Sequence, residues 1–231
     1  MELEAFLTRW TAREGGAERA NYQGFLYELC DVLGVARPEV SGADASRNNY
    51  VFERAVRQRR PECAGAPRRI DLYKRGCFIL EAKQSRLPGR KNALPGQFEM
   101  LEEPVALGRR SIARGWDVMM LNARRQAEAY VFLLDADHAA PPFLITCDVG
   151  NCLELYADFS GTGRGYGPFP DRQNFRVYLH DLRDPAVLDR LKTVWENPAS
   201  LDPTRAAAQV TRGIAQQLAI ISKALEARHN G

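Results

Sequence analysis

The chain has few of the residues from which zinc sites and cysteine or histidine active sites are built. Its 231 residues include three histidines and five cysteines. Only Cys147 and Cys152 lie close together, and their spacing matches no usual zinc knuckle. His138 and His180 stand beside acids, but no nucleophile completes a triad with either of them. We therefore expect no Cys/His zinc site, and most of the thiols are predicted to be small core residues.

Long apolar runs are also missing. No stretch approaches the roughly 20 apolar residues of a transmembrane helix. The N-terminal sequence MELEAFLTRW lacks the basic start and the apolar core of a secretory signal. Hydrophobic residues make up 45% and charged residues 26% of the chain, a composition typical of soluble globular proteins. We expect a cytoplasmic protein that makes no membrane contact.

Positive charge is concentrated in one part of the chain. The formal net charge is +3, yet residues 54–91 contain 12 Lys and Arg against three acids, Glu62, Asp71 and Glu81. Such a tract is either a solvated basic face or a surface that binds phosphates. The residues expected to neutralise backbone phosphates of a nucleic acid are Arg54, Arg57, Arg59, Arg60, Arg68, Arg69 and Lys74.

Hydrophobic periodicity and turn residues predict an α/β chain in which helices and strands are mixed. The expected strands cover residues 50–56, 69–73, 77–83, 143–149 and 152–159. The expected helices cover residues 18–34 and about 109–137, and a last helix begins at Asp202-Pro203. A surface loop is expected over residues 84–108. The apolar stripe of the last helix consists of Val210, Ile214, Leu218, Ile221 and Leu225.

Three charged residues are predicted to share one face of a hairpin. If Lys74-Arg75-Gly76 is its loop, Asp71 lies opposite Ile79 and on the same face as Glu81 and Lys83. A shift of one residue would put the two carboxylates on opposite faces. Two carboxylates beside a lysine suit Mg²⁺ or Mn²⁺, and the lysine could orient an attacking water. The alternative is a Glu81–Lys83 ion pair on a solvated sheet face.

The spacing of Asp71 and Glu81-Ala82-Lys83 resembles the PD-(D/E)XK nuclease superfamily, whose core is a mixed central sheet flanked by helices. Gln126 and Tyr130 resemble the Q-x-x-x-Y motif of several branches, although they could simply form a helix face. No proline precedes Asp71, which departs from the signature. The resemblance assigns catalysis to Asp71, Glu81, Lys83, Gln126 and Tyr130. It assigns metal binding to Asp71, Glu81, Ala82 and, unless it is simply an exposed side chain, Glu28.

Longer stretches resemble the N-terminal part of type IIL restriction-modification enzymes of the MmeI kind. These stretches are NYQGFLYELCDVLGV, YVFERAV, RRIDLYKRGCFILEAKQ, LYADFSGTG, FPDRQNFRVYLHDLRDP and LDPTRAAAQVTRGIAQQLA. The resemblance covers essentially the whole chain and implies a nuclease-like domain over residues 1–160 and a helical connector over residues 161–231. It implies a Mg²⁺-dependent endonuclease module that cuts double-stranded DNA. Cleavage of both strands would need two active sites and hence dimerisation on DNA, for which the sequence shows no interface. The DNA methyltransferase and target-recognition module would lie outside this chain, in cis or in trans.

Two further hypotheses concern ligands and an alternative function. The glycine-rich stretch ADFSGTGRGYG follows a predicted strand, as in nucleotide and S-adenosylmethionine sites, but such sites need a helix directly after the loop. Gly167-Pro168-Phe169-Pro170 blocks a helix there, so we expect no S-adenosylmethionine site in this chain. The alternative function is a non-catalytic DNA-binding scaffold that docks a DNA methyltransferase through its last helix.

Overall fold

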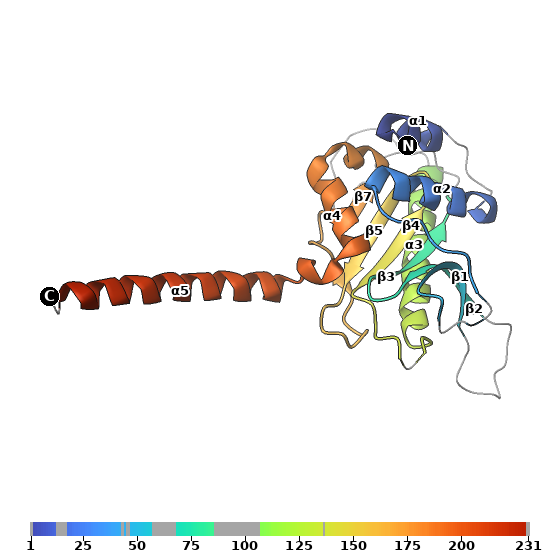
Figure 1. Ribbon diagram of the computed structural model, residues 1–231. Coiled ribbons are helices and arrows are strands. Elements are labelled where there is room, and N and C mark those ends of the chain that lie inside the picture. The colour runs from blue at the N-terminus through green and yellow to red at the C-terminus, as the bar shows by residue number, and fades with distance from the viewer. Residues whose placement is uncertain are drawn as a thin grey trace.

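The computed structural model describes residues 2–12, 18–42, 44, 47–56, 68–85, 107–135 and 137–229 (Figure 1). Its α-helices are α1 (Leu3–Thr11), α2 (Glu18–Leu33), α3 (Leu107–Val131), α4 (Pro185–Glu196) and α5 (Pro203–His229). Its strands are β1 (Tyr50–Val56), β2 (Arg68–Lys74), β3 (Phe78–Lys83), β4 (Phe143–Asp148), β5 (Cys152–Ala157), β6 (Gly167–Pro168) and β7 (Arg176–Tyr178). The short 3-10 helices η3 (Leu179–Arg183) and η4 (Pro198–Leu201) flank α4.

The strands form one mixed sheet of seven strands. Their order is β1-β2-β3-β4-β5-β6, and β7 also pairs with β5. β3 and β4 run parallel, whereas the other pairs are antiparallel. Parallel neighbours need a long crossover, and the chain between β3 and β4 contains α3. The predicted mixed sheet flanked by helices is therefore confirmed.

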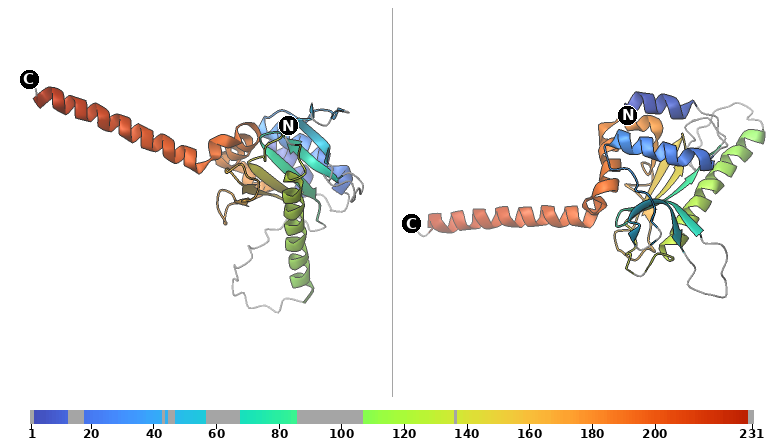
Figure 2. Two further views of the ribbon diagram at one scale, coloured as in Figure 1. Left: turned by 90° about the horizontal axis from the view of Figure 1, so that it is seen from below. Right: turned by 45° about the vertical axis from the view of Figure 1, so that its right-hand side comes forward.

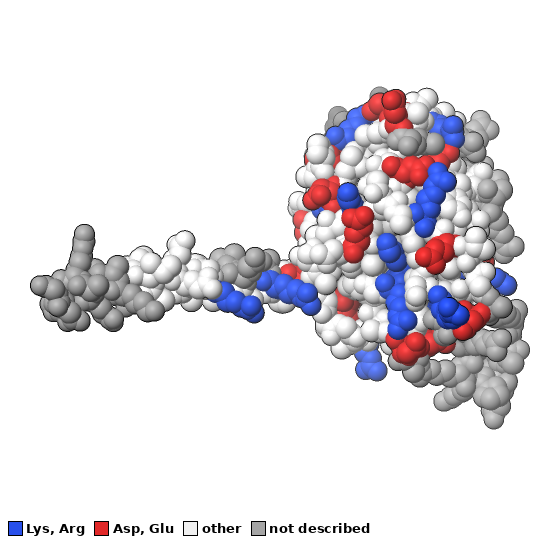
Figure 3. Space-filling view, in the orientation of Figure 1, with Lys and Arg blue, Asp and Glu red and all other residues white. Residues whose placement is uncertain are grey.

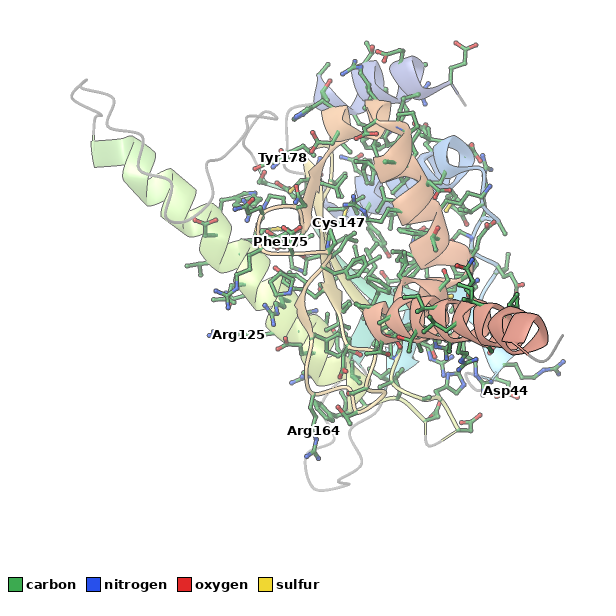
Figure 4. The ribbon with its side chains drawn as sticks, turned by 90° about the vertical axis from the view of Figure 1, so that its left-hand side faces the viewer. Asp44, Arg125, Cys147, Arg164, Phe175 and Tyr178 are labelled. Carbon is green, nitrogen blue, oxygen red and sulfur yellow. The ribbon has the colours of Figure 1, made fainter. Side chains whose placement is uncertain are left out.

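Helices cover both faces of the sheet, and each side has its own core. Phe25 of α2 and Trp195 of α4 pack with Leu80 on one face, and both aromatic residues are fully buried. Tyr130 of α3 packs with Ile79 on the other face. Figure 4 shows the sheet between α3 on one side and α4 on the other. Full burial of a large apolar side chain contributes roughly 1.5–3 kcal/mol, so these two cores hold the sheet in place.

Several elements differ from their predicted extents. α1 was not predicted, although Phe6, Leu7 and Trp10 are buried at helical spacing. β6 and β7 have two and three residues, too few to show a period. The helix predicted to reach residue 137 ends at Val131. The packed core continues past residue 160, where the sequence predicts a domain boundary, because β7 and Trp195 belong to it.

α5 projects away from the rest of the described chain (Figures 1 and 2). Ile214, Leu218 and Ile221 of its predicted stripe are 57%, 61% and 55% exposed, so the described residues do not cover this face. The side chains of Val210 and Leu225 lie outside the described part of the structure. Among the described helices, none is both long enough and apolar enough to cross a membrane.

Candidate active site

The β2–β3 hairpin carries the predicted acidic pair in a register that differs from the predicted one. Tyr73 pairs with Ile79, and the turn consists of residues 75–77, with Gly76 in the left-handed region at a φ of 69°. The prediction that Asp71 faces Ile79 was therefore wrong by two residues, because glycine occupies the middle of the turn and not its end. A shift of two preserves the alternation of faces. Continued in this register, Asp71 lies directly opposite Glu81.

The two strands part at this pair. Regular pairing of β2 with β3 stops at Leu72–Leu80. The Ala82 amide then donates to Asp71 Oδ2 at 2.7 Å, so a side-chain carboxylate occupies the place of a strand carbonyl. From here β2 continues along β1, whereas β3 continues along β4. Asp71 and Glu81 thus follow the last regular pair, at the point where the two halves of the sheet diverge.

Glu81 and Lys83 form a partly buried ion pair. Lys83 Nζ donates to Glu81 Oε1 at 2.7 Å, and the side chain of Glu81 is 2% exposed against 21% for Lys83. The two residues are partners, as the alternative reading of the sequence expected, but their face of the sheet lies under α3 and is not solvated. A buried carboxylate is costly unless a cation and hydrogen bonds compensate it. Lys83 supplies that cation.

α3 brings Gln126 and Tyr130 to the same place. Gln126 Nε2 donates to Tyr130 Oη at 2.8 Å, and Tyr130 is 3% exposed. Burial raises the pKa of Tyr130, the hydrogen bond from Gln126 opposes this rise, and the nearby Glu81 and Asp71 carboxylates add to it. The structure therefore brings together the five residues to which the resemblance assigned catalysis.

Glu28 and Ala82 fit the predicted metal site differently. Trp10 Nε1 donates to Glu28 Oε2 at 2.7 Å, and Arg9 forms an ion pair with the other oxygen. Both oxygens of Glu28 thus bind side chains of α1 and not the Asp71–Glu81 pair. The carboxylate is also partly buried, so it is not simply exposed. Ala82 lies between Glu81 and Lys83 on β3 and could serve a cation only through its main-chain carbonyl.

The predicted phosphate-binding residues divide into three groups. Arg54 is 1% exposed, and its guanidinium lies 4.7 Å from the centre of the Tyr73 ring, so this arginine belongs to the core and its assignment to DNA binding is corrected. Arg68 and Arg69 are exposed on β2 just before Asp71, and Lys74 is partly buried at its other end. Figure 3 shows Lys and Arg interspersed with Asp and Glu on one face of the body. The residues outside the described chain are Arg57, Arg59 and Arg60.

Two residues that the sequence did not single out also reach the site. Tyr22 Oη on α2 donates to Glu53 Oε1 on β1 at 2.5 Å. Glu53 and Asp71 lie between the paired positions Phe52–Leu72 and Arg54–Ile70, but they do not themselves pair. Glu53 has a positive φ of 54°, which no sequence pattern indicates, because glutamate has no preference for the left-handed region.

A buried polar row extends from Glu81 across the sheet beneath α3. The register aligns Glu81 with Thr146, Glu154 and Arg176 on successive strands. Glu154 accepts from Arg176 Nε and Nη2 at 2.9 and 2.6 Å and from Thr146 Oγ1 at 3.1 Å. The one charged residue inside the otherwise apolar CLELYA strand, Glu154, was the available signal for this row.

The donor set at the divergence point suits one kind of cation. In the described ranges, no group of three or more His, Cys, Asp or Glu side chains is placed to hold a metal ion. Mg²⁺ usually keeps several waters and takes only one or two protein carboxylates, with substrate phosphates supplying further oxygens. Asp71, Glu81 and the Ala82 carbonyl therefore fit Mg²⁺ better than a metal that needs a full set of protein ligands.

Comparison with known proteins gives one match. No curated protein and no solved structure matches the chain. A family model described as "MmeI, N-terminal domain" matches residues 1–228, which is nearly the whole sequence. The chain therefore belongs to the MmeI N-terminal domain family, a family of restriction enzymes.

Proposed function

We propose that this chain is a Mg²⁺-dependent endonuclease module of a restriction-modification system and hydrolyses phosphodiester bonds of double-stranded DNA. The observation that carries this proposal is that Asp71 bonds to the Ala82 amide, next to Glu81, where β2 and β3 part, and that Lys83 is bound to Glu81. Membership of a restriction-enzyme family supports DNA as the substrate. A structural ion pair alone would not need a second carboxylate at the same register position.

Each residue of the pair would contribute to holding the ion. Asp71 is oriented by the Ala82 amide, so one of its oxygens is fixed before any ligand arrives. Glu81 is held by Lys83 and would provide the second carboxylate. The ion, when bound, would polarise a phosphoryl oxygen and lower the pKa of a water molecule.

The remaining residues would bind and orient the substrate. Lys83 is partly exposed and could position the attacking water or offset the negative charge that develops on the phosphate. Gln126 fixes the hydroxyl of Tyr130 beside the carboxylates. Arg68 and Arg69 would neutralise backbone phosphates, which makes binding dependent on salt.

Plasmid cleavage tests this function. In Mg²⁺, Asp71→Asn and Glu81→Gln should each lower the cleavage rate by about 100-fold or more, as the loss of a group that stabilises charge in a transition state does. Asp189→Asn removes an exposed carboxylate on α4 and should leave the rate unchanged. Wild-type chain that binds DNA but never nicks it, even with a methyltransferase partner present, would favour the scaffold function.

The exposed stripe of α5 favours a second role that is compatible with either function. Ile214, Leu218 and Ile221 form an apolar face that the described chain leaves uncovered. We propose that this face docks a DNA methyltransferase and target-recognition module, in cis or in trans. Dimerisation on DNA, which would allow both strands to be cut, stays a prediction.

A further inference from the structure

Strands β1 and β2 pair regularly except at one position. Their register is constant from Tyr50–Lys74 to Val56–Arg68, and only the pair Glu53–Asp71 is missing from it. Glu53 has a φ of 54° and is the one non-glycine residue with a positive φ in the described part of the chain. Such a conformation is unfavourable for a residue with a side chain and persists only where its surroundings impose it. Specific contacts must therefore hold Glu53.

Both strands change faces at this position. In a regular strand, residues an even number of positions apart point to the same side of the sheet. Phe52 packs in the core under α2, whereas Val56 packs in the core under α3. In β2, Leu72 belongs to the first core and Ile70 to the second. Asp71 lies at the point where the side chains of β2 switch faces of the sheet. Strand distortions are common next to active sites.

The contact that holds Glu53 comes from α2. Tyr22 Oη donates to Glu53 Oε1 at 2.5 Å and accepts from Gln23 Nε2 at 3.1 Å. Tyr22 is 3% exposed, and its ring packs edge-on against Phe52 at 5.8 Å. Burial raises the pKa of Tyr22, the hydrogen bond to Glu53 raises it further, and Asp71 adds a smaller contribution in the same direction. The hydroxyl therefore lies near both carboxylates.

We propose that Glu53 is a positioning residue: anchored by Tyr22 in a left-handed conformation, it turns β2 so that the Asp71 carboxylate faces β3 beside Glu81. A regular strand at this position would pair with Asp71 in the ladder and direct its side chain away from the Ala82 amide. The catalytic consequence rests on the proposed nuclease function. The structural consequence, the hydrogen bond from Ala82 to Asp71, does not.

The test uses the full chain and two readouts. Glu53→Val introduces a β-branched residue that disfavours a positive φ. We expect the Ala82 amide to exchange with solvent about tenfold faster or more, as happens when a protecting hydrogen bond opens. We also expect kcat for plasmid cleavage to fall by a larger factor than KM changes, because the Asp71 carboxylate moves, whereas of the two phosphate-binding arginines only Arg69 also bonds to the Glu53 carbonyl, at 3.4 Å. Glu53→Gln keeps an acceptor for Tyr22 and should restore both readouts towards the wild type.

Controls separate this role from a general effect on the strand. Ala55→Val places the same side chain at an exposed, regular position of β1 and should change neither readout. Tyr22→Phe removes the anchor alone and decides the question if Glu53→Val does not fold. An unchanged Ala82 amide and unchanged kcat in Tyr22→Phe and Glu53→Val, or equal effects of Ala55→Val, would overturn the positioning role. If the wild-type chain never cuts DNA but the Ala82 amide exchanges faster in Glu53→Val, the nuclease function is overturned and the positioning role is still supported.

Discussion

The glycine-rich loop after β5 resembles a nucleotide-binding loop in sequence, but one of its own carboxylates organises it. The glycine-rich stretch after β5 folds around Asp158, which accepts hydrogen bonds from the backbone and hydroxyl of Ser160 and from the amides of Arg164 and Gly165. Burial opposes ionisation of Asp158, but these donors outweigh it and lower its pKa to about 2. The loop is thus held by one internal acid.

Asp158→Asn should destabilise the protein by roughly 1–3 kcal/mol at neutral pH, because the amide donors of this loop lose a charged acceptor. The pKa of Asp158 is lower in the folded chain than its ordinary value of 3.8, so its contribution is fully present above that value and is lost as the pH falls towards 2. Urea unfolding at pH 7, 4 and 3 should show that the difference in free energy of unfolding between variant and wild type becomes smaller as the pH falls. A gap that stays constant over this range would contradict the assignment.

At the same scale, the sequence singled out the residues of the candidate site that the structure brings together, but not the residues that orient them. Glu81 and Lys83 stood out because they interrupt an otherwise apolar strand, and Asp71 because of its spacing from them. Tyr22 and Glu53 did not, because a left-handed glutamate has no signature and a buried tyrosine looks like any other core residue. Arg54, which was expected to neutralise phosphates, follows Glu53 on β1 and is buried.

Elements with a sustained hydrophobic periodicity or with clear boundary residues were predicted closely. The helix expected over 18–34 is observed as Glu18–Leu33, and the strand over 50–56 is observed as Tyr50–Val56. Asp202-Pro203 begins α5 as expected. The hairpin register could not be fixed, since one glycine indicates a turn without saying which position it occupies.

The exposed face of α5 gives a prediction for this element. Ile214→Glu with Leu218→Glu should weaken capture of a type IIL methyltransferase and target-recognition chain by roughly tenfold or more, because apolar anchors dominate interface energy. Gln216→Glu with Gln217→Glu adds the same charge to the same exposed helix without removing an apolar side chain. Equal association of both double variants with the partner would end the docking proposal.

In the whole molecule, the candidate site lies where two halves of one sheet separate. The core under α3 includes Val56 and Ile70 from the β1–β2 half and Ile79 and Leu144 from the β3–β4 half. This core therefore connects the two halves of the sheet, while α3 itself packs mainly against β3 and β4. The row from Glu81 to Arg176 continues the same polar layer to β7, so the site is integrated into the packed body, whereas α5 stands apart from it (Figure 2).

Anomalous diffraction from crystals of the full chain grown in Mn²⁺ would locate the proposed ion directly. For the wild type, we predict a peak between Asp71 and Glu81, with oxygens of both carboxylates about 2.1 Å away as in octahedral oxygen sites. Asp71→Asn crystals should lose this peak. A wild-type structure at saturating Mn²⁺ with no peak between these carboxylates, or with the ion bound elsewhere, would contradict the metal-dependent active site.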